Sequence, residues 1–240
     1  MTQLYSNFIY NEERRFVFAY VPKVACTNWK SLLRYMEGHE NWLDSQLAHD
    51  KKNGGLRYLG HTENDEEILR NSAVKKYTMV RNPYSRVLSS YLNKIHSRLI
   101  NRDKVDHFAS VTKKIDAFRV SHLSVDVFPT VNFEVFLHWL SESSNREVQD
   151  EHWAPQNKLI RFDEVKYDFI GKFENIKNDS EIILGMMECN KKFPTHEDIK
   201  FPPTNAQRRL AEHYTPRAII LANQLYSQDF RDFGYDTWGT

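Results

Sequence analysis

The sequence predicts an α/β fold in which helices flank a central parallel sheet. Three stretches rich in β-branched and aromatic residues, at 16–21, 76–80 and 167–174, have the composition of buried strands. A segment with helical signals follows each of them. Strands that alternate with helices are typical of parallel sheets with crossover helices. Ligands of such sheets bind beyond the carboxyl ends of the strands, so we expect the functional residues there.

Length and composition predict a single domain over residues 1–240. With 40% hydrophobic residues, the chain can bury one sizeable core. The net charge of +1 gives no indication of nucleic acid or of an anionic membrane as a partner. No apolar run approaches the roughly 20 residues that span a bilayer, and no signal-peptide pattern opens the chain. We therefore expect no transmembrane segment, and the sequence carries no signal for the oligomeric state.

The segment 16–30, FVFAYVPKVACTNWK, predicts a strand, a tight loop and the start of a helix. Pro22 ends the strand, and Thr27 or Asn28 is expected to cap the helix. A helix start of this kind aims several backbone N–H groups and the positive end of the helix dipole at one point. Lys23 adds a full positive charge. The segment therefore predicts a phosphate or sulfate site.

This anion loop differs from an ATPase loop. The glycine-rich pattern that ends in Gly-Lys-Ser/Thr is absent, because the chain has no glycine before Gly38. Val24 follows Lys23, where an ATPase loop has a hydroxyl residue that binds Mg²⁺. A nucleotide phosphotransferase is therefore disfavoured.

A second segment, VRNPYSRVLSSY at residues 80–91, predicts another phosphate contact. Arg81 follows a core strand, and Pro83 suits the first turn of the next helix. Ser89 is eight residues after Arg81, which places it about two turns along that helix. Arginine supplies the forked, charge-assisted contact that phosphate favours. An ordinary crossover with a surface arginine is the alternative, which the presence of both segments in this order disfavours.

The first segment also carries a family resemblance. VPKVACTNWK resembles the 5′-phosphosulfate loop of the Golgi carbohydrate sulfotransferases, the chondroitin 4-O family in particular. The pieces EHWAPQ, YDFIGKFENI and LYSQDFRDFGY resemble further parts of that family. The resemblance implies a P-loop-NTPase-like sulfotransferase fold. It also implies in-line transfer of sulfonate from 3′-phosphoadenosine 5′-phosphosulfate (PAPS) to a carbohydrate hydroxyl, without a metal ion.

The resemblance assigns donor-binding roles residue by residue. Lys23 is expected at the bridging and departing oxygens, with the loop amides at the non-bridging ones. Arg81 and Ser89 are expected at the 3′-phosphate. The donor-binding residues are thus predicted to be Lys23, Val24, Ala25, Cys26, Thr27, Asn28, Trp29, Arg81 and Ser89. One further side chain is expected to contact the 3′-phosphate, and the sequence does not choose among the candidates Lys158, Arg161, Arg208 and Arg209.

Transfer to a hydroxyl needs a base, and a neutral histidine, with an ordinary pKa of about 6.5, suits this task near pH 7. His61 follows a short predicted strand at 56–59, in the topological position of the catalytic histidine of the heparan 2-O- and 6-O-sulfotransferases. His152 lies in the shared His-Trp element. Glu63 and Glu151 are fallback bases. A capping role for the first histidine and a packing role for the second are the structural alternatives.

Residues 94–148 match no part of the family, so we expect an acceptor-specific insertion there. The basic stretch 94–119 is compatible with an anionic acceptor and equally with a solvated surface. Two roles are compatible with Trp153: stacking on a sugar or adenine ring, or packing in the core. A lipid or small-molecule acceptor, or an inactive module that still binds PAPS or a glycan, are the remaining functional alternatives.

Two cysteines, Cys26 and Cys189, do not make a disulfide framework, and this favours a reducing, cytoplasmic location. Golgi relatives carry luminal disulfides and a membrane anchor. The alternative is therefore a luminal domain trimmed from such an anchor. The spacing of His, Cys and Asp residues indicates no metal site.

Overall fold

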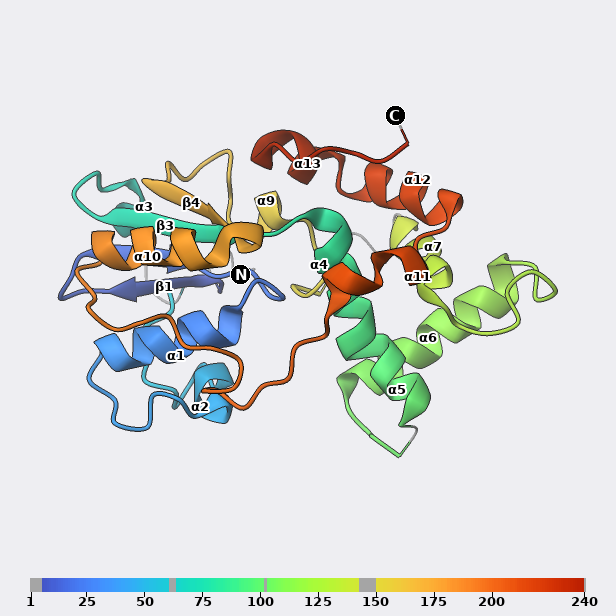
Figure 1. The fold of residues 1–240 in the computed structure, drawn as a ribbon, viewed down its shortest axis with the longest axis horizontal. Helices are drawn as coiled ribbons and strands as arrows, with labels where there is room; N and C mark the ends of the chain where they lie inside the picture. Colours follow the sequence, from blue (N-terminus) through green and yellow to red (C-terminus); the bar gives the residue numbers. More distant parts are fainter. Residues whose placement is uncertain (1–5, 61–63, 102, 143–149, 240) are drawn as a thin grey trace. The chain divides into compact units, whose positions relative to one another are not determined.

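The computed structural model describes residues 6–60, 64–101, 103–142 and 150–239 (Figure 1). The chain divides into two compact units. Unit 1 comprises Met1–Arg81 and Gln156–Pro203, and unit 2 comprises Asn82–Pro155 and Thr204–Thr240. The expectation that residues 1–240 act as a single domain stays a prediction.

Unit 1 contains a four-stranded sheet in the order β1-β2-β3-β4. Its strands are β1 (Phe8–Asn11), β2 (Phe16–Ala19), β3 (Lys75–Val80) and β4 (Phe169–Lys172). The last three run parallel to one another, which confirms the predicted α/β sheet. The edge strand β1 pairs antiparallel with β2 and was not predicted.

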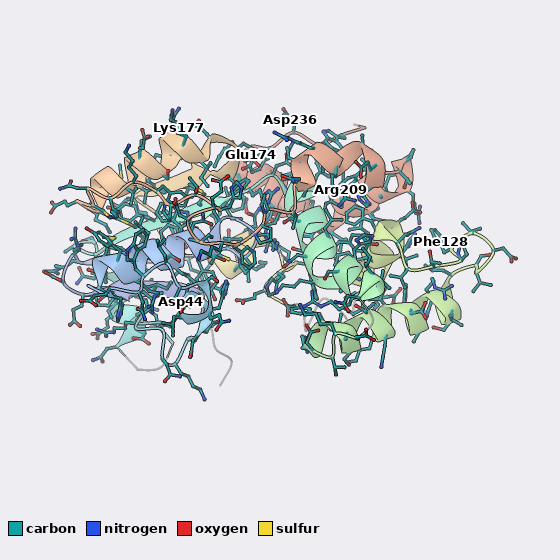
Figure 2. The ribbon with its side chains drawn as sticks, turned by 60° about the horizontal axis from the view of Figure 1, so that its bottom comes forward. Asp44, Phe128, Glu174, Lys177, Arg209 and Asp236 are labelled. Atoms are coloured by element: carbon teal, nitrogen blue, oxygen red, sulfur yellow. The ribbon has the colours of Figure 1, made fainter. Side chains whose placement is uncertain are left out.

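Short helices accompany the sheet of unit 1. They are α1 (Cys26–Met36), α2 (Ser45–His49), α3 (Asp65–Arg70), α9 (Gln156–Leu159), the 3-10 turn η2 (Phe173–Asn175) and α10 (Ile176–Met186). The side chain of Asp44 caps α2 (Figure 2). Gly171 lets α10 approach β4, because a Cβ atom there would lie 3.0 Å from Met79 Cε and 3.2 Å from Asp179 Cβ.

Two strand predictions were too long or wrong. The stretch 56–59 forms no strand; only Tyr58 makes an isolated bridge, to Ile9 of β1. The predicted strand 167–174 is confined to β4, because the chain turns into η2 at Phe173. Residues 57–59 do lie along β1, because the amides of Tyr10 and Leu59 donate to the carbonyls of Arg57 and Phe8, both at 2.9 Å, but this pairing is too short to make a strand.

Unit 2 is helical in its described part. Its helices are α4 (Pro83–Ser90), the π-helix η1 (Tyr91–His96), α5 (Ser97–Ile100), α6 (His107–His122), α7 (Phe133–Ser141), η3 (Ala206–Arg209), α11 (Leu210–His213), α12 (Pro216–Leu225) and α13 (Ser227–Phe233). The side chains of Asn132 and Thr215 cap α7 and α12. Helix α6 was not predicted, because only Val111, Thr112, Ile115 and Arg119 of it are buried.

Aromatic side chains dominate the core of unit 2. Trp153 is 2% exposed and meets the ring of Phe136 edge to face, with centroids 5.5 Å apart. This burial gives Trp153 the core position that was one of its two predicted alternatives. The hydroxyl of Tyr226, the residue that follows α12, donates to the Trp153 carbonyl at 2.7 Å, so the backbone of Trp153 is also held in place. No helix in the described residues combines the length and apolarity that crossing a membrane requires.

Candidate active site

The loop between β2 and α1 folds tightly without glycine. Lys23 and Ala25 take the left-handed backbone conformation, with φ of 70° and 51°. That conformation costs a residue other than glycine about 1–2 kcal/mol. Between them, the amide of Val24 donates to the carbonyl of Val21 at 3.2 Å. The fold thus imposes a turn that ATPase loops make with glycine.

Helix α1 begins directly after this turn. Ala25 is its N-cap, and no side chain caps the first turn. The N–H groups of a first helical turn have no acceptor within the helix, so they are presented at its end together with the positive dipole. This is the arrangement that binds phosphate and sulfate groups in other proteins.

Thr27 and Asn28 brace the loop, and the prediction that one of them caps α1 was wrong. Both lie inside the first turn of the helix. The hydroxyl of Thr27 lies 2.9 Å from Nε2 of His49, and Nδ2 of Asn28 donates to the carbonyl of Pro194 at 2.9 Å. These contacts tie the start of α1 to α2 and to the chain after α10. A direct contact of either side chain with a ligand stays a prediction.

Trp29 anchors α1 beneath the loop. Its side chain is fully buried, and its ring lies 4.5 Å from that of Phe18 and 4.7 Å from that of Phe193, measured between centroids. The structure therefore gives Trp29 a supporting position, which holds the helix start against β2.

Arg81, at the carboxyl end of β3, contacts the same loop. Its Nη1 donates to the carbonyl of Lys23 at 3.0 Å, and its guanidinium carbon lies 4.4 Å from the ring centroid of Phe173. The side chain is 6% exposed. The structure thus brings Arg81, from the second predicted segment, to the Lys23 loop within unit 1, as expected for residues at the carboxyl ends of adjacent parallel strands.

Gln156 fixes the backbone of Arg81 and was missed in the sequence. Its Oε1 accepts from the Arg81 amide at 2.9 Å, and its Nε2 donates to the Arg81 carbonyl at 2.8 Å. The amide side chain thereby continues the pairing of β3 where the sheet ends. The family-like piece EHWAPQ contained Gln156, but nothing in that piece indicated its partner.

We expect Gln156→Leu to destabilise the protein. The substitution removes both hydrogen bonds at a fully buried position. The amide and the carbonyl of Arg81 then have no partner for these bonds. Each unpaired group costs about 1–3 kcal/mol, so the free energy of unfolding should fall by about 2–6 kcal/mol. Urea unfolding measures this loss. Gln46→Leu, at an exposed position of α2, is the matched control; equal stability of the two variants would contradict the prediction.

In unit 2, Ser89 lies on α4 as predicted. Its hydroxyl is 2.9 Å from that of Thr204, and its side chain is buried. Arg81 is the last residue of unit 1, whereas Ser89 belongs to unit 2. That these two residues bind one phosphate therefore stays a prediction.

His152 sits in a short turn of unit 2 beside Asp150. The carboxylate oxygen Oδ1 of Asp150 contacts Nδ1 of His152 and accepts from its backbone amide at 2.9 Å. Burial lowers the pKa of His152 below the ordinary value, although the hydrogen bond to Asp150 opposes this. His152 is therefore a neutral imidazole at pH 7, the form that accepts a proton.

Arg86 holds this turn against α4 by hydrogen bonds, a role that the sequence did not predict. It is 1% exposed, and it donates to the carbonyls of Ala154 at 2.7 Å and Glu151 at 3.0 Å. Ser90, one turn further along the same helix, donates its hydroxyl proton to the carbonyl of His152. The helix α4 thus determines where the turn lies within unit 2.

The geometry agrees with a family assignment by sequence. The profile described as Sulfotransferase family matches residues 6–236. The chain belongs to the sulfotransferase family. The predicted membership is thereby confirmed, and the match covers both units of the chain.

Individual relatives extend this result. The chain is 30% identical to carbohydrate sulfotransferase 14 of Mus musculus over 241 residues, which cover 97% of this chain and 61% of the mouse protein. It is 26% identical to carbohydrate sulfotransferase 11 of Rattus norvegicus over 250 residues, covering 95% and 67% of the two chains. Carbohydrate sulfotransferase 8 of Homo sapiens is 26% identical over 246 residues, covering 96% and 55%. The chain thus spans about six-tenths of the first of these relatives. No solved structure gives a significant match.

Several predicted site residues of the chain are not brought to the Lys23 loop by the described contacts. His61 and Glu63 lie outside the described residues. Arg161 pairs with Glu164. Arg209 (Figure 2) bonds Glu212 at 3.0 Å and Nε2 of His213 at 3.1 Å. Contacts of Lys158 and Arg208 with the 3′-phosphate stay predictions. Within the described ranges, no three His, Cys, Asp or Glu side chains gather to hold a metal ion, and a metal-free reaction stays a prediction.

Proposed function

We propose that this protein transfers a sulfonate group from PAPS to a hydroxyl group of a carbohydrate. The observation that carries the proposal is the hydrogen bond from Arg81 to the backbone carbonyl of Lys23, which holds a guanidinium against the glycine-free loop that leads into α1. The names of the relatives support a carbohydrate as the acceptor. An anionic carbohydrate fits the basic residues of the stretch 94–119.

The proposed donor chemistry follows from the charges on both sides. PAPS carries a 5′-phosphosulfate and a 3′-phosphate, which need positive charge and N–H donors. The amides of the first turn of α1, which have no acceptor within the helix, suit the phosphosulfate, and so does the ammonium group of Lys23. The guanidinium of Arg81 suits the 3′-phosphate.

Transfer concentrates negative charge on the oxygen that leaves with the nucleotide. In the reaction, the acceptor oxygen bonds to sulfur while the bond between sulfur and the 5′-phosphate oxygen breaks. Preorganised N–H donors and a cation near that oxygen lower the barrier. We assign this role to Lys23, and we place the amides of residues 25–28 at the non-bridging oxygens, because the Val24 amide already donates to the carbonyl of Val21. The hydroxyl proton passes to a base, for which His61 and His152 are the candidates.

Calorimetric titration with 3′-phosphoadenosine 5′-phosphate (PAP) tests the donor site. A charge-assisted hydrogen bond contributes about 1.5–3 kcal/mol, so Arg81→Ala should weaken PAP binding by roughly 10- to 150-fold. Arg70→Ala, at an exposed position of α3, should bind PAP like the wild type. ATP with Mg²⁺ serves as the competing nucleotide. No binding of PAP, or a preference for ATP with Mg²⁺, would contradict the proposal.

The acceptor class needs a separate assay. Wild-type protein with radiolabelled PAPS is offered a panel of neutral and anionic oligosaccharides, a glycolipid and a small phenol. Label transferred to oligosaccharides supports the proposal. Label only on the glycolipid or phenol would overturn the carbohydrate assignment, and PAP binding without any transfer would indicate a binding module.

A cytoplasmic location is also part of the proposal. Cys26 and Cys189 are both free thiols, and this is the state that a reducing compartment maintains.

A further inference from the structure

We infer that Asp150 positions His152 as the acceptor of the proton that the carbohydrate hydroxyl loses during transfer. The inference rests on the proposed function and extends it to a residue whose role no sequence pattern indicated. Asp150 acts through His152, so it is a positioning residue. We call the two side chains the Asp150–His152 dyad.

The dyad is built from two bonds to one carboxylate oxygen. Oδ1 of Asp150 accepts from the backbone amide of His152 at 2.9 Å and contacts Nδ1 of its ring. The first bond fixes the chain of His152 and the second fixes the rotation of its imidazole. A carboxylate that only capped the turn would need the first bond alone.

Other groups of unit 2 hold the dyad from several sides. Arg86 and Ser90 of α4 bind the carbonyls of the turn, as described above. The ring of Phe108 meets the imidazole of His152 perpendicularly, with centroids 5.3 Å apart. Nδ1 and both backbone polar groups of His152 are therefore engaged by protein.

The remaining ring nitrogen is the one suited to take up a proton. An ionised carboxylate only accepts hydrogen bonds, so the contact with Asp150 requires the proton of neutral His152 to sit on Nδ1. Nε2 then carries the lone pair. Within the described part of the chain, no hydrogen bond reaches Nε2, and 20% of the side chain is exposed. The lone pair is thus available to an acceptor hydroxyl.

The surrounding charges favour a neutral histidine that becomes charged only on proton transfer. Burial and the ammonium of Lys94 lower the pKa of His152, whereas Asp150 and Glu151 raise it. Burial would raise the pKa of Asp150, but the hydrogen bonds from His152 and the nearby His107 hold it below the ordinary value. Asp150 is therefore ionised at pH 7 and stabilises the imidazolium once it forms.

In this step the bond that forms to sulfur replaces the bond that breaks. The acceptor oxygen forms its bond to sulfur, and the electron pair of the broken sulfur–oxygen bond leaves with PAP. The hydroxyl proton moves to Nε2 of His152. The positive charge on the imidazolium is then balanced by the Asp150 carboxylate, and the proton returns to solvent.

The first test measures the protonation of His152 directly and needs no turnover. Full-length protein with ¹⁵N-labelled histidine is titrated by NMR, and the His152 signals are assigned by their loss in His152→Gln. We expect the neutral ring to carry its proton on Nδ1. In Asp150→Asn the pKa of His152 should fall, because the charge that supports the imidazolium is gone. A proton on Nε2 in the wild type would overturn the inference, even if Asp150→Asn does not fold.

The second test measures turnover against pH. His152→Gln should lower kcat by about 10²–10⁴-fold, and Asp150→Asn by about tenfold or more. In Asp150→Asn the acidic limb of kcat/KM should move to lower pH, while PAP affinity stays at the wild-type value. A merely structural role would lower activity without moving this limb. Asp126→Asn, exposed in the same unit, should match the wild type.

The outcomes separate this inference from the proposed function. Full turnover in His152→Gln, or an unmoved acidic limb in Asp150→Asn, would overturn the inference while wild-type sulfonation still supported the function. His61 would then become the expected base. Failure of the wild type to bind PAP would overturn the proposed function and the base role together.

Discussion

Lys23→Met should lower kcat for sulfonate transfer by about 10²–10³-fold, because it removes a cation from the oxygen on which negative charge develops. Binding of PAP should weaken far less, since the amides of α1 and the guanidinium of Arg81 stay in place. The fold should be unaffected. Methionine is as unbranched as lysine at Cβ and meets the same backbone cost at a φ of 70°.

Single-turnover transfer from labelled PAPS, combined with PAP calorimetry, separates these two effects. Lys52→Met, at an exposed position of unit 1, is the matched control and should keep wild-type kcat. Wild-type kcat in Lys23→Met would remove Lys23 from the chemistry. Loss of PAP binding with kcat kept at saturation would instead make Lys23 a residue of ground-state binding.

Trp29→Ala should reduce the free energy of unfolding by about 3–5 kcal/mol, the usual cost of deleting a fully buried large aromatic side chain. The cavity would open between Phe18 of β2 and Phe193, whose rings both contact the indole. Because α1 would lose its anchor, the loop that precedes it should also lose its fixed shape. PAP affinity should therefore fall even in the fraction of protein that remains folded.

Urea unfolding followed by circular dichroism measures the stability loss. Trp42→Ala is the matched control, because Trp42 is only half-buried and contacts Tyr35 at a centroid distance of 5.4 Å. Its loss should be clearly smaller than that of Trp29→Ala. Equal losses would show that the contacts of Trp29 do not anchor α1 as described.

The sequence was informative where one local pattern determines the structure. The apolar runs at β2 and β3 and the proline after each of these strands predicted the two strands and the helices that follow them. The parallel order of β2 and β3 also accounts for the proximity of Lys23 and Arg81, since neighbouring parallel strands deliver their carboxyl ends to one edge.

The sequence was uninformative where the structure depends on distant or weakly patterned residues. Gln156 lies 75 residues from Arg81, and only the folded chain shows that its amide completes the end of β3. Strand β1 has four residues, too few for a period of two to stand out. Helix α6 has a mostly polar surface, so the 3.6-residue period that marks a packed helix is faint.

Helix α4 holds the turn that contains His152 by hydrogen bonds, and this has a consequence for changes in the length of the chain. Arg86 and Ser90 supply the donors that hold the turn. Both lie on a helix more than 60 residues earlier in the chain. These bonds fix the turn of His152 to α4 within unit 2. We therefore expect a change in the length of the chain before Asp150 to leave the imidazole of His152 in place as long as Arg86 and Ser90 are kept.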